Sequence, residues 1–427
     1  MRNKVQVHIE SVAFKGYGVT RIKGKVVFIP YTVTGDQAWI ELIEEKKNYS
    51  MGRLNQIIEP SAFRVDPPCP YFGRCGGCQW QHIDSSIQGE LKKRILAGIL
   101  KQIARLKEIP SISLVPSPDP YDYRVRVQLK VKGEAMGYYQ ERSHKMVEID
   151  HCSISHPLIN QIIRKLREES FILSRMEEIE INVSPGEGKG VLVFHPRSYD
   201  QRIEHFIMEF LQNQRILRGI AIARKGGLNL LGDPTLNFRI LLSQAREKRN
   251  LTFRISSESF SQVNLEQNQN LIQTVLQFSE VNKGDRVLDL YAGVGNLTLP
   301  LAMGAKEVLG IEENKMAVED ARSNAERNGI KNCDFIHGRV EDVLMSSKRE
   351  TSDLAVLDPP RTGCKTILDQ VIRLKPKKII YVSCEPTTFS RDLHLFSERG
   401  YTLQRLGLID MFPQTFHMEV IGLLQQS

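Results

Sequence analysis

The C-terminal part of the chain alternates between two hydrophobic periods. Short apolar runs typical of strands are separated by amphipathic stretches typical of helices, with strands expected at 286–290, 307–311, 334–337, 354–357 and 378–382 and helices at 297–303 and 315–328. Strands that are connected through helices form a parallel sheet with helices on both faces. We therefore predict an α/β, Rossmann-like fold for residues 251–427, ending in an antiparallel hairpin at 400–406 and 418–424.

The preceding residues follow other patterns, and 427 residues are too many for a single core. Residues 1–60 alternate apolar and polar side chains in short runs broken by glycines, which is typical of a small β-barrel. Residues 61–250 open with a proline-rich junction, continue with an amphipathic helix over 90–106 and then mix strands with helices, which favours a central α/β domain. We expect three domains with these boundaries.

The charge of the chain is compatible with a phosphate-rich partner. Lys and Arg outnumber Asp and Glu by 58 to 50, which gives a formal net charge of +8. Many proteins with such a balance bind no nucleic acid, so the charge alone does not identify a partner. No apolar stretch approaches the length of a membrane span. We expect a cytoplasmic protein that acts as a monomer and has no membrane partner.

The turn after the first strand of the C-terminal domain has the form of a nucleoside-binding loop. The segment Asp289–Asn296 reads DLYAGVGN, and its glycines allow the backbone to approach a ligand closely. Glu312 ends the next strand, where a carboxylate can accept hydrogen bonds from both ribose hydroxyls. The turn alone could hold a dinucleotide, but it lacks the third glycine of that fingerprint. The phrase is similar to the S-adenosylmethionine motif of methyltransferases.

Two further segments follow predicted strands. Asp358-Pro359-Pro360-Arg361 comes after strand 354–357, and its prolines fix a turn that presents the carboxylate beside the ligand. Cys384 comes just after strand 378–382. An exocyclic amine has its own lone pair, whereas the fifth carbon of uracil or cytosine becomes nucleophilic only after a thiolate has added to the ring. A single buried thiol is often inert, but beside these motifs Cys384 is a candidate nucleophile.

A carboxylate near the C-terminus can complete such a reaction. Once a methyl group has joined the ring carbon, the proton there is acidic and a base can remove it, so that the thiolate is expelled. Glu419, in the segment Asp410–Glu419, is our candidate base. His417 is the alternative, and an alternating strand would place both side chains on one face. If Glu419 has no catalytic role, we expect it to be a solvent-exposed glutamate of the hairpin.

Four of the seven cysteines are candidates for a metal site. Cys69, Cys75 and Cys78 lie within ten residues, and Cys152 follows later in the chain. In a long chain without a signal peptide such a cluster favours metal binding or catalysis over disulfides. Four thiolates suit either a tetrahedral zinc ion or a 4Fe-4S cluster, and the spacing alone does not choose between them.

Together these segments resemble the RNA 5-methyluridine methyltransferase family, in particular its iron–sulfur branch with a TRAM domain, an OB-like RNA-binding barrel. The resemblance covers essentially the whole chain. It is carried by Phe14–Val19 and Lys46–Tyr49 in the barrel, by the cysteine spacing, by Ser259–Asn264, and by the SCEP and HME segments at 383–386 and 417–419.

The resemblance implies S-adenosyl-L-methionine and a 4Fe-4S cluster as cofactors. It implies Cys384 as nucleophile and Glu419 as proton acceptor, and it implies cofactor contacts from Gln262, Tyr291, Asn296, Glu312 and Asp358 and cluster ligation by Cys69, Cys75, Cys78 and Cys152. One position departs from the pattern: Arg339 follows Gly338 where many methyltransferases have an adenine-binding Asp. The adenine contact is therefore open, with Asp342 as a weak substitute.

The expected reaction is methylation of the C5 position of a uridine in 23S rRNA, with the target base flipped out of its stack. A transfer-RNA uridine is the alternative substrate, although the barrel and the cysteine cluster favour rRNA. A non-catalytic iron–sulfur RNA-binding protein would need none of the site residues together. A cytosine enzyme would carry a second cysteine in a Pro-Cys motif, whereas here the segment is Asp358-Pro359-Pro360 and Cys364 lies farther on.

Overall fold

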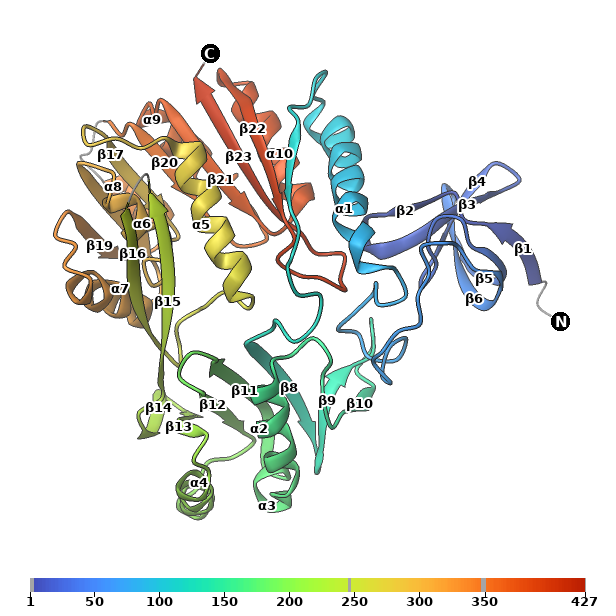
Figure 1. Ribbon diagram of the computed structural model, residues 1–427, viewed down its shortest axis with the longest axis horizontal. Coiled ribbons are helices and arrows are strands. Elements are labelled where there is room, and N and C mark those ends of the chain that lie inside the picture. The colour runs from blue at the N-terminus through green and yellow to red at the C-terminus, as the bar shows by residue number, and fades with distance from the viewer. Residues whose placement is uncertain (1–3, 245–246, 347–350, 427) are drawn as a thin grey trace.

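The computed structural model describes residues 4–244, 247–346 and 351–426. Within these residues the strands form sheets of six, seven, two and eight members (Figure 1). The six-stranded sheet is N-terminal, the seven-stranded sheet is central in the sequence, and the eight-stranded sheet is formed mainly by the C-terminal residues. No helix in the described part of the chain is long and apolar enough to cross a membrane.

The N-terminal sheet has its own small core. Its strand order is β1-β5-β6-β4-β3-β2, and three register shifts between β5 and β6 bend it. The buried side chains of its core are Val7, Ile9, Val27, Ile29, Ala38 and Ile40. Its strands are β1 (Lys4–His8), β2 (Ser11–Ala13), β3 (Tyr17–Ile22), β4 (Lys25–Ile29), β5 (Gln37–Glu45) and β6 (Tyr49–Glu59), with a short 3-10 helix at Phe14–Gly16.

The central sheet has the order β10-β9-β8-β11-β12-β13-β14 and packs against three helices. The apolar stripes of α2 and α4 recur at three and four residues, so each helix buries one face on the sheet. The elements are β8 (Arg126–Lys132), β9 (Ala135–Tyr139), β10 (Met146–Glu148), α2 (Pro157–Arg167), α3 (Ser170–Leu173), β11 (Met176–Ser184), β12 (Lys189–Pro196), α4 (Gln201–Asn213), β13 (Leu217–Arg224) and β14 (Gly227–Gly232).

The C-terminal sheet has the order β19-β18-β17-β20-β21-β23-β22-β7, and the first five strands run parallel. Helices cover both faces, which confirms the predicted Rossmann-like fold. Its later elements are α5 (Leu265–Ser279), β17 (Arg286–Leu290), α6 (Thr298–Ala302), β18 (Glu307–Glu312), α7 (Lys315–Arg327), β19 (Cys333–His337), α8 (Val340–Ser346), β20 (Leu354–Leu357), α9 (Leu368–Arg373), β21 (Lys378–Ser383), α10 (Pro386–Ser397), β22 (Tyr401–Ile409) and β23 (Glu419–Gln426). The antiparallel pairing of β22 with β23 is the predicted terminal hairpin.

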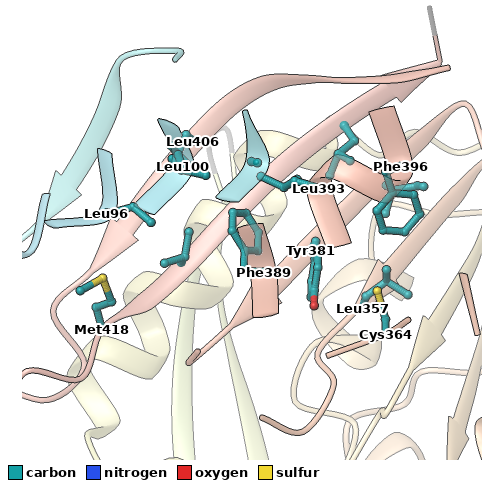
Figure 2. Packing of buried hydrophobic residues seen from close by; sticks show 14 of the residues in the cluster. Leu96, Leu100, Leu357, Cys364, Tyr381, Phe389, Leu393, Phe396, Leu406 and Met418 are labelled. Atoms are coloured by element: carbon teal, nitrogen blue, oxygen red, sulfur yellow. The ribbon is translucent and has the colours of Figure 1, made fainter. Parts of the chain in front are cut away.

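One segment that we expected in the central domain packs elsewhere. Helix α1 (Ser85–Ile99), the π-helical turn Leu100–Ala104 and strand β7 (Ile112–Val115) join the C-terminal sheet, where β7 pairs with β22. Leu96 and Leu100 belong to the same core cluster as Phe389 and Leu406 (Figure 2). The expected domain 61–250 is therefore not continuous in space. The amphipathic pattern showed that α1 buries a face, but not which sheet receives it.

A second segment crosses the expected boundary at 250. Strands β15 (Thr235–Gln244) and β16 (Glu247–Ser256) form a long antiparallel ribbon. The backbone N–H of Arg254 donates to Asn324 on α7 at 2.7 Å, and Phe253 packs in one of the two cores of the C-terminal sheet. Leu236 and Phe238, in contrast, pack against Val191 of the central sheet. The ribbon thus connects the central and C-terminal parts.

Candidate active site

A cavity of about 850 Å³ brings the predicted site residues together. It lies where the parallel strands of the C-terminal sheet end, because Tyr291, Glu312, Asp358 and Cys384 each follow or finish one of these strands. Ten of the eleven predicted residues line it: Gln262, Tyr291, Glu312, Asp358, Cys384, Glu419, Cys69, Cys75, Cys78 and Cys152. The eleventh, Asn296, lines a smaller adjoining cavity of about 80 Å³ that also borders Gln262, Tyr291 and Asp358.

The cofactor wall, which we define as residues 289–296 with Glu312 and Asp358, is built largely by local contacts. The Glu312 carboxylate accepts hydrogen bonds from the backbone N–H groups of Gly293 at 2.9 Å and Asn314 at 2.8 Å. Gly295 adopts a positive φ of 86°, and a Cβ there would lie 2.4 Å from Leu299. Glu312 therefore fixes the turn and keeps lone pairs for a ligand.

Two polar groups of the cofactor wall are unusual. Asn296 and Asn268 exchange two amide hydrogen bonds of 2.8 and 2.9 Å. Asp289 is buried, and one of its carboxylate oxygens has no hydrogen-bond partner within the protein. Burial raises the pKa of Asp289 to about 7, although the hydrogen bond from Thr298 lowers it. An unsatisfied buried carboxylate that borders a cavity is suited to receive a donor from a ligand.

Cys384 and Glu419 lie side by side at neighbouring strand ends. Strands β21 and β23 pair antiparallel with Ser383 opposite Val420, so Cys384 and Glu419 are the next residues at this end of the ladder. Burial, followed by the Glu419 carboxyl, raises the pKa of the Cys384 thiol to about 11, while the Arg361 guanidinium, which hydrogen-bonds the thiol, lowers it. Burial, followed by Asp358, raises the pKa of Glu419 well above its usual range.

The position and the pKa of His417 bear on the choice between His417 and Glu419 as the base. His417 precedes β23 rather than lying within it, so it does not alternate with Glu419 along one strand as we had expected. Burial and the charges of Arg361, Lys92 and Arg124 lower the pKa of His417 to about 4. Its imidazole is thus neutral at pH 7 and a weaker base than Glu419, which favours Glu419 as proton acceptor.

The four clustered cysteines line the same cavity. Burial raises the pKa of Cys75 to about 11, and the neighbouring Cys152 and Cys69 raise it further. Burial and the same neighbours raise the pKa of Cys78 well above its ordinary value. Over the described ranges, no three His, Cys, Asp or Glu side chains converge closely enough to hold a metal ion. The thiols are thus near enough to influence one another, without converging on one ion.

Sequence reasoning missed several residues that line the large cavity. Arg124, Arg126 and Phe260 are among them, and the Arg126 guanidinium lies 5.6 Å from the centre of the Phe260 ring. Nη2 of Arg126 donates to Glu180 at 3.0 Å, while its buried Nη1 has no partner. No motif marks these arginines, because strand 126–132 reads as ordinary alternation. In contrast, Asp342 is exposed and borders neither cavity, so the adenine contact stays open.

Comparison with known proteins extends this picture. The profile of the family described as tRNA (uracil-5-)-methyltransferase matches residues 86–427, and that of the TRAM domain of tRNA (uracil(54)-C(5))-methyltransferase matches residues 5–63. An uncharacterized RNA methyltransferase of Aquifex aeolicus is 34% identical and covers 100% of this chain and 99% of its own. The 23S rRNA (uracil(1939)-C(5))-methyltransferase RlmD of Pectobacterium atrosepticum is 34% identical over 96% of this chain and 90% of its own.

The fold of one solved structure matches that of this protein over nearly the whole chain. The crystal structure of Pyrococcus abyssi tRNA (uracil-54, C5)-methyltransferase in complex with S-adenosyl-L-homocysteine has a TM-score of 0.78 and 25% sequence identity, and covers 98% of this chain and 99% of its own. Its bound product of S-adenosylmethionine agrees with the ligand predicted from the turn at Asp289–Asn296. The chain therefore belongs to the tRNA (uracil-5-)-methyltransferase family, as an S-adenosylmethionine-dependent RNA uracil-5-methyltransferase with an N-terminal TRAM domain.

Proposed function

We propose that the protein methylates the C5 position of a uridine in 23S rRNA through a covalent bond between Cys384 and C6 of the base. The observation that supports this proposal is the shared cavity in which the Cys384 thiol, the Glu419 carboxyl and the cofactor wall meet. A thiol and a base beside a methyl donor are the groups that such a reaction requires. The cavity of about 850 Å³ is large enough for a flipped nucleotide beside the cofactor.

S-adenosylmethionine, when bound, supplies an electrophilic methyl group. We assign its binding to Gln262, Tyr291, Asn296, Glu312 and Asp358, which border the two adjoining cavities. The residues fit a nucleoside with a charged amino group. The Glu312 carboxylate can accept the ribose hydroxyls, and the unpartnered oxygen of Asp289 can accept a hydrogen bond from an ammonium group.

Cys384 and Glu419 divide the chemistry between them. The Cys384 thiolate would add to C6 of the uracil. The electron pair displaced to C5 would then form the new bond to the methyl carbon while the bond from that carbon to the sulfonium sulfur breaks, so that S-adenosylhomocysteine is the leaving group. Glu419 then takes the proton from C5, the C6–S bond breaks, and the double bond and the thiolate are restored. Both groups must lose a proton before they act. Arg361 favours ionisation of the thiol, whereas the charge of Asp358 opposes ionisation of Glu419.

We further propose that Cys69, Cys75, Cys78 and Cys152 hold a 4Fe-4S cluster. The four cysteines line the cavity, and neighbouring thiols of this set contribute to the raised pKa of Cys75, Cys78 and Cys152. Four thiolates are the usual ligand set of such a cluster. The cluster would tie the segment after the barrel to the central domain, and methyl transfer itself involves no electron transfer. Protein purified without oxygen should contain about four irons per chain. Zinc without iron in that preparation would contradict the assignment.

The expectation of an RNA substrate rests on the barrel and on the rim of the cavity. Lys46, Lys47 and Tyr49 are exposed on the barrel, and Arg124, Arg126 and Phe260 border the cavity, which suits phosphates and stacked bases. The RlmD relatives act on 23S rRNA, which favours that substrate and a cytoplasmic location, and we expect a monomer. A tRNA uridine is the second candidate, because the Pyrococcus abyssi enzyme of the same architecture acts on tRNA.

The experiment that tests the proposal compares the two RNAs directly. Purified protein is incubated with S-adenosylmethionine and either 23S rRNA or bulk tRNA from a strain that lacks the gene, and methylated uridines are mapped by mass spectrometry. We expect 5-methyluridine at a defined site in 23S rRNA and none in tRNA. Methylation of tRNA alone would show that the substrate is a tRNA uridine, the second candidate. A methyl group on a base nitrogen or on ribose would contradict the proposed chemistry.

A second measurement tests the covalent step. Fluorine at C5 leaves no proton for Glu419 to remove, so target RNA with 5-fluorouridine should form a methylated adduct that survives a denaturing gel. The adduct should map to Cys384. An adduct on Cys333 or Cys364 would show that another thiol is the nucleophile.

A further inference from the structure

The loop between β22 and β23, residues 410–418, forms part of the cavity. We call it the catalytic loop, because Phe412, Thr415 and His417 line the cavity and Glu419 follows directly. Its backbone is irregular: Gln414 adopts a positive φ of 67°, which is unfavourable for a residue with a Cβ. Such a conformation persists only where surrounding groups hold it.

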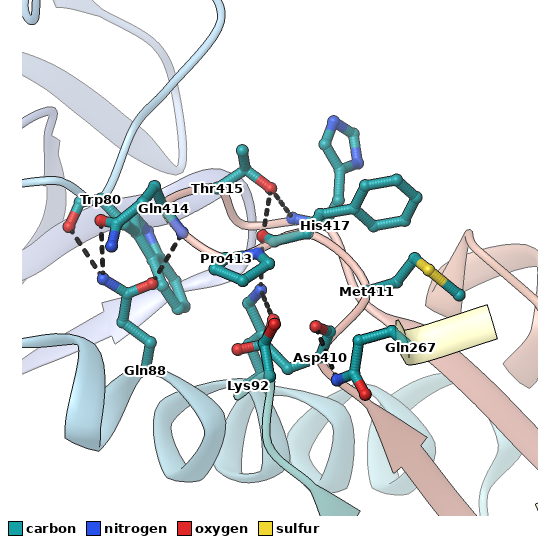
Figure 3. Close-up of polar contacts among 12 residues, drawn as sticks. Trp80, Gln88, Lys92, Gln267, Asp410, Met411, Pro413, Gln414, Thr415 and His417 are labelled. Carbon is teal, nitrogen blue, oxygen red and sulfur yellow. Dashed lines mark hydrogen bonds and ion pairs between the residues drawn. The ribbon is translucent and has the colours of Figure 1, made fainter. Parts of the chain in front are cut away.

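The side chain of Gln88, on helix α1, binds both the backbone and the side chain of Gln414. The Gln88 side chain is fully buried. Its Oε1 accepts a hydrogen bond from the Gln414 backbone N–H at 2.9 Å, and its Nε2 donates to Gln414 Oε1 at 3.1 Å (Figure 3). The same Nε2 also contacts the backbone oxygens of Trp80 and Ile83. The Gln88 amide therefore ties the loop to the segment that enters α1.

Lys92, one turn further along α1, holds the start of the same loop. Its Nζ lies 2.6 Å from Asp410 Oδ1 and donates to the Phe412 backbone oxygen at 2.9 Å (Figure 3). The Lys92 side chain is fully buried, so this ion pair is shielded from water. Breaking such a pair leaves an uncompensated buried charge, which makes the contact sensitive to either partner.

Other parts of the chain complete the enclosure. The backbone N–H groups of Gln79 and Trp80, which follow Cys78 directly, donate to the Gln414 oxygen at 3.1 and 3.0 Å. The Tyr123 hydroxyl donates to the Pro413 oxygen at 3.1 Å, and Phe14 of the barrel packs edge-on against Phe416. The loop thus has contacts from all three parts of the molecule.

We propose that Gln88 and Lys92 are positioning residues for the target base, because they fix the catalytic loop against the cavity. This inference rests on the proposed function. The loop supplies Phe412, Thr415 and His417 to the side of the cavity next to Glu419, whereas the cofactor wall comes from other strands. Releasing the loop should therefore impair the reaction on the base and leave cofactor binding unchanged.

The test uses the full-length protein prepared without oxygen and four variants: Gln88→Met, Gln414→Met, the double variant of these two, and Lys92→Met. Methionine keeps the approximate side-chain volume of glutamine. Gln88→Met removes both hydrogen bonds to Gln414, whereas Gln414→Met removes only the bond to Gln414 Oε1 and leaves the one from its backbone N–H. We expect kcat to fall by about tenfold to a hundredfold in each single variant, while the Kd of S-adenosylmethionine by calorimetry changes less than about twofold. Because the two amides act on one contact, the double variant should be no slower than the slower single variant.

Two controls separate positioning from general stability. Gln102→Met changes an exposed glutamine shortly after α1, and Lys93→Met changes the partly exposed lysine next to Lys92 as the counterpart of Lys92→Met. Both controls should match the wild type. Hydrogen exchange should accelerate at the amides of residues 411–418 in the Gln88 variant but not at those of β20 and β21. Unchanged kcat despite faster exchange would overturn the proposal, and so would a parallel loss of cofactor affinity.

The exchange measurement also separates this inference from the proposed function. It requires no RNA and no turnover, so it reports on the loop even if the wild-type protein methylates no uridine. If the wild type methylates uridine and the loop variants equal it in rate, only the positioning role fails. If exchange at 411–418 is the same in the Gln88→Met variant and the wild type, Gln88 does not hold the loop.

Discussion

The cofactor wall and the catalytic loop face the same cavity, but they are stabilised in different ways. The cofactor wall is a strand-turn-helix unit whose backbone is held by Glu312, a residue of the adjacent strand. The catalytic loop is held by Gln88, which lies 326 residues from Gln414 in the sequence, and by Lys92, 318 residues from Asp410. The difference shows that one active site can combine a locally specified part with a part that depends on the assembled molecule.

The cofactor wall and the catalytic loop should form at different stages of folding. The cofactor wall comes from β17 and its two hydrogen-bonded neighbours β18 and β20, so it should form with that part of the sheet. The catalytic loop can reach its final conformation only after α1, the segment before it and Tyr123 have packed against it, because its hydrogen-bond partners come from them. The barrel adds the ring contact of Phe14 with Phe416. Changes in the two regions should therefore separate cofactor binding from chemistry on the base, and four substitutions test that separation.

The largest effect is expected from Cys384→Ala. Without the thiolate, C5 of uracil is not nucleophilic, so methylation should fall by at least about a thousandfold. The Kd of S-adenosylmethionine should be unchanged, since the cofactor wall does not depend on this side chain. Methylation is measured by transfer of a labelled methyl group to RNA. The control is Cys333→Ala, a thiol that borders neither cavity and should keep full activity.

Glu419→Gln should produce the next largest effect. The amide cannot accept the C5 proton, so turnover should fall by about a hundredfold or more while the covalent methylated adduct accumulates on ordinary RNA. A denaturing gel with labelled RNA detects that adduct. Glu398→Gln, at the exposed end of α10, is the matched control. Slow turnover without any adduct would instead assign Glu419 to a step before methyl transfer.

Glu312→Gln should affect the cofactor wall alone. A neutral amide can no longer accept hydrogen bonds from both Gly293 and Asn314 and from the ribose, so the Kd of S-adenosylmethionine should rise between about tenfold and a hundredfold. At saturating cofactor, kcat should approach that of the wild type. Calorimetry and steady-state kinetics provide the two numbers, with Glu319→Gln on α7 as control. A fall in kcat at saturating cofactor would show that the cofactor wall also affects the chemistry on the base, which would contradict the proposed separation.

Arg361→Met should have the smallest effect and a distinct pH dependence. The guanidinium lowers the pKa of the Cys384 thiol, which burial has raised to about 11, so its removal raises that pKa further. Below this pKa the thiolate fraction falls about tenfold for each unit of increase. We expect alkylation of Cys384 by iodoacetamide to slow by about three- to tenfold at pH 8, with a gap that narrows as the pH approaches 11. Arg399→Met is the control, and a pH-independent gap would assign Arg361 a purely steric role.

The domain organisation shows where local patterns stop being informative. Strands β17 to β21, helices α6 and α7 and the hairpin of β22 and β23 were predicted from their hydrophobic periods, because each buries faces that recur at two or at three to four residues. Helices α5, α8, α9 and α10 and strand β7 were not predicted. Helix α1 has an equally regular apolar stripe, yet its position in the C-terminal core could not be predicted. Periodicity specifies that a face is buried, whereas the surface that covers it depends on the shapes of segments distant in the chain.

The sequence by itself determined which residues meet at the candidate site. In a parallel α/β sheet all strands end at one edge, so a residue directly after a strand is placed in the site by topology; Tyr291, Asp358 and Cys384 meet there for that reason. Only the tertiary structure decided how the catalytic loop is held. The contacts of Gln88 and Lys92 depend on long-range packing. In the sequence Lys92 appears as an ordinary polar residue of the amphipathic helix predicted at 90–106, and Gln88 precedes that predicted helix.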